Sequence, residues 1–234
     1  MKQLITAIKN LDFPTVMALH DLNPELISWA EPSGKNALHY LGEVNVTNRP
    51  DNASLEILRY LLNRGADMNS VHTIKDEGDT FPATPLWYAY AHGHNQEMVN
   101  YLLEQGADPQ NCMFAVAWND DPEGAALFQK YGAAIDPEFN HSTPFFAAFL
   151  WKKFAVAEWF ANNGANINYA DEDGRTTLFH AVKKRFTPAQ IETLLKYGAD
   201  PKKEDKQGVS PLGVAQRNRE HRIVNMFNEA SPTT

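Results

Sequence analysis

The sequence of 234 residues contains a single cysteine, Cys112, and no long apolar run. One cysteine excludes an internal disulfide framework and a zinc site made of cysteines alone, and it suits a reducing compartment. The longest apolar runs, such as residues 144–151, fall far short of the roughly 18 residues of a membrane-spanning helix, and residues 1–13 show no signal-peptide pattern. We therefore expect a cytoplasmic protein that does not enter a membrane.

Sequence motifs that carry chemistry are also lacking. The chain has no phosphate-binding glycine loop and no His-x3-His or Cys-x2-Cys spacing that would indicate a metal site. The pair His92 and His94 flanks a glycine in a turn between two predicted helices, and Cys112 has no histidine close to it in sequence. We expect no catalysis, no cofactor and no bound metal.

Positive charge is scarce overall, because 21 Lys and Arg residues face 29 Asp and Glu residues, for a net charge of −8. This balance disfavours general affinity for nucleic acids. The distribution is uneven: residues 1–174 hold 10 basic and 23 acidic residues (net −13), whereas residues 175–234 hold 11 and 6 (net +5). The two ends of the chain should therefore attract different surfaces.

What the sequence does have is internal repetition, the feature to test first in any fold prediction. The tripeptide Gly-Ala-Asp or Gly-Ala-Asn begins at Gly65, Gly106, Gly164 and Gly198, with a degenerate copy at Gly132, and the successive spacings are 41, 26, 32 and 34 residues. A glycine at these places can end a helix in the left-handed conformation. The spacings centre on a unit of about 33 residues.

A second landmark precedes most of these glycines. Thr or Ser followed by Pro and a large apolar residue occurs at residues 84–86, 143–145 and 210–212, with variants at 36–38 and 176–178. The hydroxyl side chain caps an exposed amide, and proline fits the first helical position. Two short amphipathic runs lie between the landmarks, which predicts a helix, a turn and a second helix in each unit.

Residues 84–108 and 171–176 follow the pattern of the ankyrin-repeat family almost position by position, and the sequence resembles this family over essentially its entire length. The resemblance implies an all-α fold, an ankyrin-repeat solenoid of about seven stacked helix-turn-helix units with finger loops, in one domain over residues 1–230 with a frayed tail at 231–234. The predicted units are residues 1–31, 32–71, 72–110, 111–137, 138–170, 171–203 and 204–230.

Irregular units are the places where binding is most often found. The second unit has about eight extra residues around 46–53, between its helices. The third has a long finger carrying Asp76, Glu77 and Asp79, which we interpret as a solvated loop. The fourth lacks most of its finger, and we take Cys112 as the residue at the start of its first helix, a buried structural position.

The ankyrin family generally binds partners with its finger tips and with exposed positions of the first helices, which line a concave face. Carried over by position, the resemblance predicts ten partner-binding residues: His92, Asp120, Phe139, Asn140, Leu150, Trp151, Asp173, Arg175, Lys183 and Lys184. Trp151 is the first candidate for an energetic anchor, beside Leu150 and Phe139. Alternatively, residues 145–151 fill the gap that the short fourth finger leaves, and the Lys183–Lys184 pair serves only the C-terminal end of its helix.

These residues predict a monomeric, non-catalytic module that binds an unidentified folded protein or peptide. One alternative is an inhibitor or immunity-type protein that occludes a basic active site with its acidic half, and another is a secreted ankyrin effector. A weaker alternative is nucleic-acid or anionic small-molecule binding on the basic C-terminal units, by six residues: Lys183, Lys184, Arg185, Arg217, Arg219 and Arg222. A steep loss of affinity with added salt would favour phosphate binding.

Overall fold

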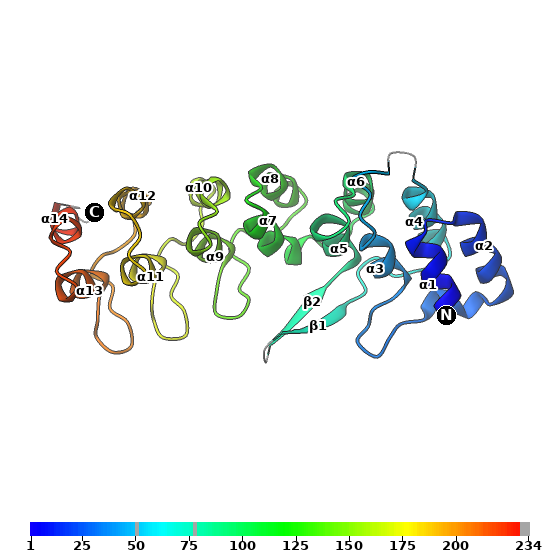
Figure 1. Ribbon diagram of the computed structural model, residues 1–234, viewed down its shortest axis with the longest axis horizontal. Helices are drawn as coiled ribbons and strands as arrows, with labels where there is room; N and C mark the ends of the chain where they lie inside the picture. Colours follow the sequence, from blue (N-terminus) through cyan, green and yellow to red (C-terminus); the bar gives the residue numbers. More distant parts are fainter. Residues whose placement is uncertain (50–51, 77–78, 230–234) are drawn as a thin grey trace. The chain divides into compact units, whose positions relative to one another are not determined.

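The structure is a computed structural model that describes residues 1–49, 52–76 and 79–229. Paired short helices dominate it (Figure 1). The described helices are α1 (Lys2–Lys9), α2 (Phe13–Leu22), α3 (Ala37–Gly42), α4 (Ser54–Asn63), α5 (Pro85–Ala91), α6 (Gln96–Glu104), α7 (Met113–Asn119), α8 (Pro122–Lys130), α9 (Pro144–Leu150), α10 (Phe154–Asn162), α11 (Thr177–Lys183), α12 (Pro188–Lys196), α13 (Pro211–Arg217) and α14 (His221–Glu229). Two 3-10 turns, Pro24–Ser28 and Gln110–Cys112, and two strands, β1 (His72–Asp76) and β2 (Asp79–Ala83), complete the description.

None of the helices in the described ranges is long and apolar enough to cross a membrane. The predicted tail at 231–234 and Glu77 of the predicted acidic finger lie outside the described residues.

The chain divides into two compact units. The first contains Met1–Ala115 and Lys130–Ala133, and the second contains Val116–Gln129 and Ala134–Thr234. In the first unit, α3 packs between α1 and α5 as an inner layer, and α4 packs between α2 and α6 as an outer layer. In the second, α11 packs between α9 and α13 in the inner layer, and α12 packs against α14 in the outer layer (Figure 1).

The predicted helix starts are confirmed at the inner helices. Thr84, Thr143, Thr176 and Ser210 each accept a hydrogen bond on the side-chain hydroxyl from the backbone N–H three residues later. Each has extended backbone angles, and proline follows three of the four. The cap satisfies one amide that the helix leaves unpaired, which contributes about 1 kcal/mol to each short helix.

The core of each unit lies between its two helical layers. Large apolar residues two positions after the cap, such as Leu86, Phe145 and Leu178, are fully buried. Alanines five positions after the cap are fully buried as well, at Ala89, Ala148, Ala181 and Ala215. Burying one large apolar side chain contributes about 1.5–3 kcal/mol, and the small residues let neighbouring inner helices approach closely.

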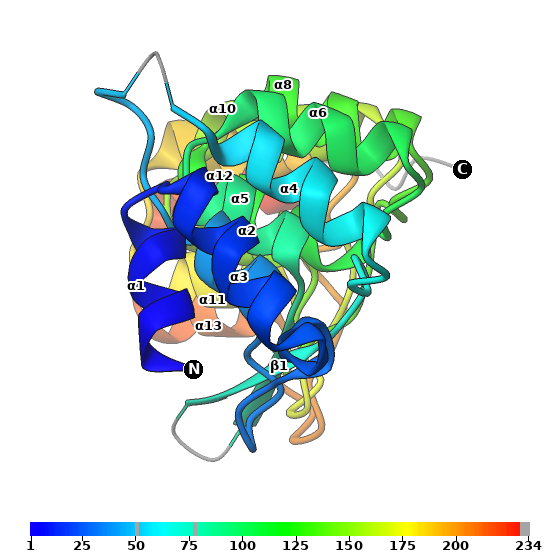
Figure 2. The ribbon, with the colours of Figure 1, turned by 90° about the vertical axis from the view of Figure 1, so that its right-hand side faces the viewer.

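The fingers differ in length as the sequence predicts. The third finger is an antiparallel hairpin of β1 and β2, with the register running from His72 opposite Ala83 to Asp76 opposite Asp79. The hairpin projects away from the helices of its unit (Figure 2), and the N–H of Thr73 donates to the carbonyl of Ser33 over 2.8 Å. In the fourth repeat a 3-10 turn leads directly into α7, so its finger is nearly absent.

Gly93 lies in a tight turn of the first unit. A Cβ added there would lie 2.3 Å from the carbonyl oxygen of Gly42 and 3.1 Å from that of Ala89. Gly42 is equally confined, with the carbonyl oxygen of Pro85 at 2.9 Å from its added Cβ. Two adjacent repeats therefore meet through glycine backbones at this point, and a side chain would push them apart.

We expect Gly93→Ala to lower the free energy of unfolding by about 1–3 kcal/mol, because overpacking against rigid backbone has a cost of that order. Urea denaturation followed by circular dichroism measures the change. Gly213→Ala is the matched control, since the nearest atom to an added Cβ there is Ser210 Oγ at 3.6 Å, and it should leave stability unchanged or slightly raised. Equal stability of the Gly93 variant and the wild type would contradict this account of the repeat junction.

Candidate functional site

The turn that ends each inner helix fixes which side chains face outward in the second unit. Lys152, Arg185 and Arg219 have φ values of 62°, 56° and 59°, and each lies nine residues after the helix cap of its repeat. Asp120 has the same backbone conformation, with φ of 55°. Counting back nine residues from Asp120 gives Asn111 as the equivalent of the cap in the fourth repeat.

The fourth repeat is therefore shifted by one residue from the predicted register. A helix start at Cys112, as predicted, would place Asp120 at the exposed end of the helix. In the structure, Asp120 lies in the turn, and its carboxylate accepts a hydrogen bond from the N–H of Val156 over 2.9 Å. The predicted contact residue Asp120 thus holds the first turn of α10, and Trp118 takes the exposed position.

Trp118 and Trp151 form a solvent-exposed aromatic pair. Their ring centroids lie 5.2 Å apart with an interplanar angle of 79°, in an edge-to-face arrangement. Trp118 is 61% exposed to solvent and Trp151 is 43% exposed. Adjacent exposed apolar side chains are a feature of interaction sites, and tryptophan is enriched among the residues that anchor protein interfaces. Sequence reasoning missed Trp118, although the buried pair Val116 and Ala117 before it marks the correct register.

Two further groups of predicted residues lie at the ends of the same layer. Leu150, half-buried, precedes Trp151 at the end of α9, and Lys183 and Lys184 are exposed at the end of α11. The Nζ of Lys152 lies 5.5 Å from the ring centroid of Phe186, the residue that follows the α11 turn. The structure thus brings four of the predicted residues to the inner-helix ends of neighbouring repeats.

A groove of about 430 Å³ continues this surface beyond α11. It is bounded by cations, an imidazole and one carboxylate over an apolar floor, and its lining residues are Arg185, Phe186, Pro188, Asn218, Glu220, His221, Arg222 and Ile223. Its composition therefore suits a ligand with an apolar part and a negative charge.

Phe139 and Asn140 lie on the fifth finger, at the opposite end of α9 from Trp151. The half-buried Phe139 exchanges backbone hydrogen bonds with Ser142, and Asn140 is exposed with φ of 50°. Helix α9 has seven residues, so about 10 Å of helix separates the finger from the indole pair. Phe139 and Trp151 therefore lie at opposite ends of α9 and do not form one contact site, although the sequence predicted them side by side.

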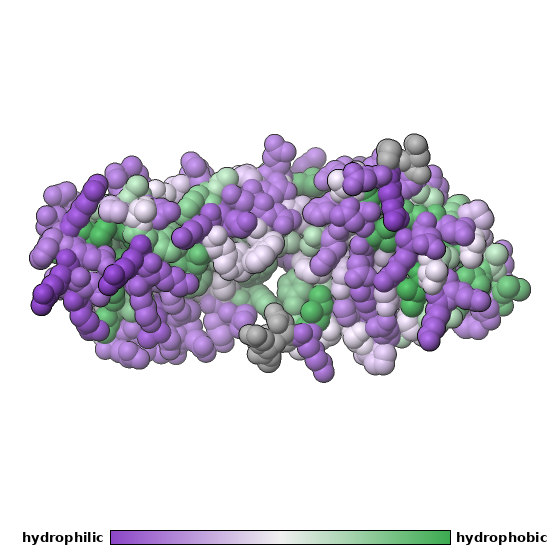
Figure 3. Space-filling model, in the orientation of Figure 1, coloured by the Kyte–Doolittle hydropathy of each residue, from purple (hydrophilic) through white to green (hydrophobic). Residues whose placement is uncertain are grey.

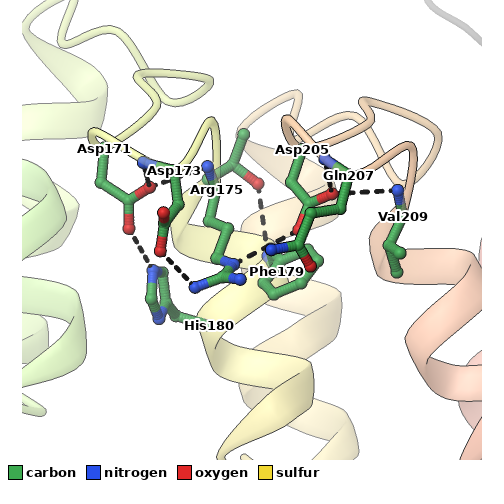
Figure 4. A network of polar contacts seen from close by, with 9 residues as sticks. Asp171, Asp173, Arg175, Phe179, His180, Asp205, Gln207 and Val209 are labelled. Carbon is green, nitrogen blue, oxygen red and sulfur yellow. Dashed lines mark hydrogen bonds and ion pairs between the residues drawn. The ribbon is translucent and has the colours of Figure 1, made fainter.

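Asp173 and Arg175 belong to a network that joins the sixth and seventh fingers (Figure 4). The Arg175 guanidinium donates from Nη1 to Asp173 Oδ2 over 2.5 Å and from Nε to Asp205 Oδ2 over 3.3 Å. Asp171 accepts N–H bonds from Asp173 and Arg175, and its Oδ2 lies 2.6 Å from His180 Nε2. These predicted contact residues thus hold neighbouring fingers together.

The carboxylate of Asp205 is the most buried charge in this network, with a side chain only 1% exposed. Burial alone would raise its pKa, but hydrogen bonds from the N–H groups of Val209 and Gln207, together with Arg175, lower the pKa below its usual value. The Asp205 carboxyl group is therefore ionised in the folded protein, and these donors stabilise its charged form.

We expect Arg175→Ala to lower the free energy of unfolding by about 1–3 kcal/mol, because it leaves the Asp205 carboxylate without its cation. Arg175→Lys should recover part of the loss, since an ammonium keeps the charge without the planar fork. Chemical denaturation measures both, with the exposed Lys184→Ala as control. The account fails if Arg175→Ala and Lys184→Ala are equally stable.

His92 lies in the first unit, at the end of α5. It is exposed, and its ring packs against Trp87 at 5.0 Å and Tyr88 at 5.4 Å between centroids. Desolvation of the ring on the side that packs against Trp87 and Tyr88 lowers the pKa of His92 from its ordinary value. His92 therefore extends an aromatic cluster of its own unit.

A half-buried lysine packs against this cluster. The Nζ of Lys35 lies 3.0 Å from Glu43 Oε2 and over two rings, 4.7 Å from the centroid of Tyr40 and 4.9 Å from that of Tyr88. Tyr40 also donates a short hydrogen bond to Glu31. Burial and the nearby carboxylates raise the pKa of both tyrosines to about 12. The cluster joins the second and third repeats and has a structural explanation.

His39 links the cap of α3 to the backbone of the next repeat. Its Nδ1 accepts from the N–H of Asn36 over 3.2 Å, which leaves Nε2 to donate to the carbonyl of Ala83 at 3.2 Å. The side chain is fully buried. Burial lowers the pKa of His39 to about 4, so the folded protein requires the neutral ring.

We expect stability to fall as the pH drops from about 6.5 to 4, because the unfolded chain binds a proton on His39 before the folded chain does. Above pH 6.5 the contribution is fully present. Measuring the unfolding free energy against pH for wild type and His39→Gln isolates it, since the variant should show a shallower loss over this window. Parallel curves for the two proteins would rule out a buried neutral His39.

Cys112 is fully buried, and burial raises the pKa of its thiol well above the ordinary range. Asp108 adds to this shift. Among the described residues, no group of three or more His, Cys, Asp or Glu side chains is arranged to hold a metal ion. The thiol is therefore a packing group in the 3-10 turn that leads into α7.

Comparison with known proteins accounts for this arrangement of capped helix pairs and fingers. A sequence-family model described as ankyrin repeats (3 copies) matches residues 145–233. A second family model, for a single ankyrin repeat, matches residues 83–113. The chain belongs to the ankyrin-repeat family. The predicted fold class, an all-α array of ankyrin repeats, is confirmed, and ankyrin repeats are general modules of protein–protein interaction.

Two solved ankyrin repeat domains have the same fold. That of Bcl-3 aligns with a TM-score of 0.72 over 97% of this chain and 97% of its own, and that of human ASB11 aligns with a TM-score of 0.70 over 99% and 98%. Both are 20% identical in sequence, so the likeness establishes the fold alone.

Among curated ankyrin proteins, a palmitoyltransferase, AKR1 of Lachancea kluyveri, is 30% identical over 161 residues, which are 69% of this chain. The chain spans 18% of the length of that enzyme. The match therefore covers only a small part of a much longer protein.

Proposed function

We propose that this ankyrin-repeat protein is a non-catalytic binding module that recognises a protein partner through the inner-helix ends of its second unit. The observation that carries the proposal is the exposed Trp118–Trp151 pair. Binding energy at protein interfaces concentrates in a few residues, and tryptophan is among the commonest of these anchors. The alternatives of an inhibitor, an effector and a nucleic-acid binder stay predictions.

The contacts of the pair explain why it suits binding rather than folding. The indoles pack edge to face on each other at 5.2 Å, while Val116 and Ala117 before Trp118 and Phe149 before Trp151 are buried. A preorganised pair loses little side-chain entropy when a partner covers it. Removing the pair should therefore affect association far more than folding.

The fingers contribute less to this surface. Asp173 and Arg175 are paired to each other and to the next finger, and their partners would have to be given up for a new contact. By contrast, Leu150, Lys183 and Lys184 lie at the ends of the helices beside the pair. The proposed surface is thus the helix-end side of the second unit.

We expect Trp118→Ala with Trp151→Ala to weaken partner binding at least about 30-fold, the equivalent of about 2 kcal/mol for a single anchor. The free energy of unfolding should fall by no more than about 1 kcal/mol, the order of an exposed edge-to-face contact. The measurement is capture from cells that express the protein, quantified by mass spectrometry, with calorimetry on any specific partner and urea denaturation of the free protein.

Leu22→Ala is the control for removal of an exposed apolar side chain, because Leu22 is 77% exposed in the first unit. It should retain the same captured proteins as the wild type. If the double tryptophan variant also retains all of them at equal amounts, the proposed surface is wrong. If the variant unfolds, the pair belongs to the core instead.

A further inference from the structure

We propose that the partner presents an extended acidic segment with one apolar side chain, which packs on the Trp118–Trp151 pair while the carboxylates follow a row of cations along the next repeats. This proposal rests on the proposed function, since it names the partner chemistry for the same surface. The basic row, as used below, consists of six exposed residues that follow the indole pair: Lys152, Lys183, Lys184, Arg185, Arg217 and Arg219.

The charge of the basic row is not neutralised within the protein. Among the described residues, no carboxylate lies within 4.0 Å of any of these six cations, whereas Arg175 in the same unit is held between two. Hydrophilic side chains dominate the face over α11–α14 in Figure 3. Unpaired cations clustered on one surface attract anions and speed their association.

Helix stability does not account for the whole row. A cation in the last turn of a helix stabilises its C-terminal end, and this explains Lys183 in α11 and Arg217 in α13. Lys152, Arg185 and Arg219 lie beyond the helix ends, in turns with positive φ. Such positions favour glycine or asparagine, so three cations there are unexpected on conformational grounds.

Direct contacts between side chains link the indole pair to the groove. Trp118 touches Trp151, and Lys152 follows Trp151 directly. The ammonium of Lys152 lies 5.5 Å from the ring centroid of Phe186. Phe186 in turn lines the groove of about 430 Å³ that Arg185 and Arg222 border. A bound chain can therefore run from the indoles to the groove without crossing a gap.

The repeat spacing sets the length of the segment. Neighbouring packed helices lie roughly 10 Å apart, so the three steps from the repeat of Trp118 to that of Arg219 span about 30 Å. An extended chain advances about 3.3 Å per residue, which gives roughly nine residues. A polyproline II segment has about three residues per turn, so carboxylates at every third position would face successive repeats.

An acidic protein segment fits this surface better than a nucleic acid does. Asp120 lies at the indole end of the path and Glu220 lines the groove at the other end, so a dense polyanion would meet like charge at both. A peptide can place its apolar residue beside Asp120 and its carboxylates between the two ends.

The test uses the full chain and fluorescein-labelled peptides of about twelve residues. One carries leucine followed by glutamate at every third position, with neutral residues between; a second has glutamine in place of each glutamate; each is made with the leucine at either end. Fluorescence anisotropy at low salt gives the affinities. A single-stranded oligonucleotide of about twelve nucleotides is the competing polyanion.

We expect the glutamate peptide, in one orientation, to bind at least tenfold more tightly than the glutamine peptide. Lys183→Glu with Lys184→Glu should weaken it at least tenfold. Lys196→Glu with Lys202→Glu, a matched charge reversal away from the row on and after α12, should change affinity less than threefold. The double variant with Trp118→Ala and Trp151→Ala should bind both peptides with lower affinity than the wild type.

Three results would overturn the inference. Equal affinity of the glutamate and glutamine peptides, with loss of both in the tryptophan variant, would leave the anchor in place and exclude an acidic partner. Tighter binding of the oligonucleotide than of the peptide would assign the row to nucleic acid. If no peptide binds at millimolar concentration, the proposed segment is wrong, while the capture experiment on the tryptophan variant judges the proposed function separately.

Discussion

Close packing of the inner helices through small buried side chains determines what the second unit shows to solvent. Ala148, Ala181 and Ala215 are fully buried at the same position of successive repeats, so their helices end in register. The residues that follow those alanines then fall into rows across repeats. A local choice of alanine over a larger residue thereby sets the geometry of a surface several residues away.

The two ends of the inner helices have different tasks in this unit. At the finger end, Arg175 bridges two carboxylates and Asp205 is saturated with donors, so charge there is used for stability. At the other end no carboxylate pairs with the basic row among the described residues, and two indoles are exposed. Polar groups that are already satisfied contribute little to binding, because a partner must replace what it displaces.

Much of the fold follows from the sequence, because caps and helix-ending glycines are local signals with a local physical cause. The helix starts at Thr84, Thr143, Thr176 and Ser210 were predicted in this way, and so were the long third finger and the short fourth one. The proposed binding surface was harder to predict from the sequence than the fold. The fourth repeat has almost no finger and no Thr-Pro or Ser-Pro motif at its helix start. Its register was therefore predicted one residue too late, from Cys112, and Trp118 was not predicted as an exposed residue. The pairing of Arg175 with Asp205 joins residues thirty positions apart, which no local pattern reveals.

The central claim is that Trp118 and Trp151 are a solvent-facing pair and not part of the core. Fluorine NMR of the protein labelled with 5-fluorotryptophan tests it most directly, with each resonance assigned by single substitution. The account predicts that both resonances shift when water is replaced by deuterium oxide, and that substituting either tryptophan moves the resonance of the other. The account would be contradicted if neither resonance shifts in deuterium oxide and neither shifts when the other tryptophan is substituted.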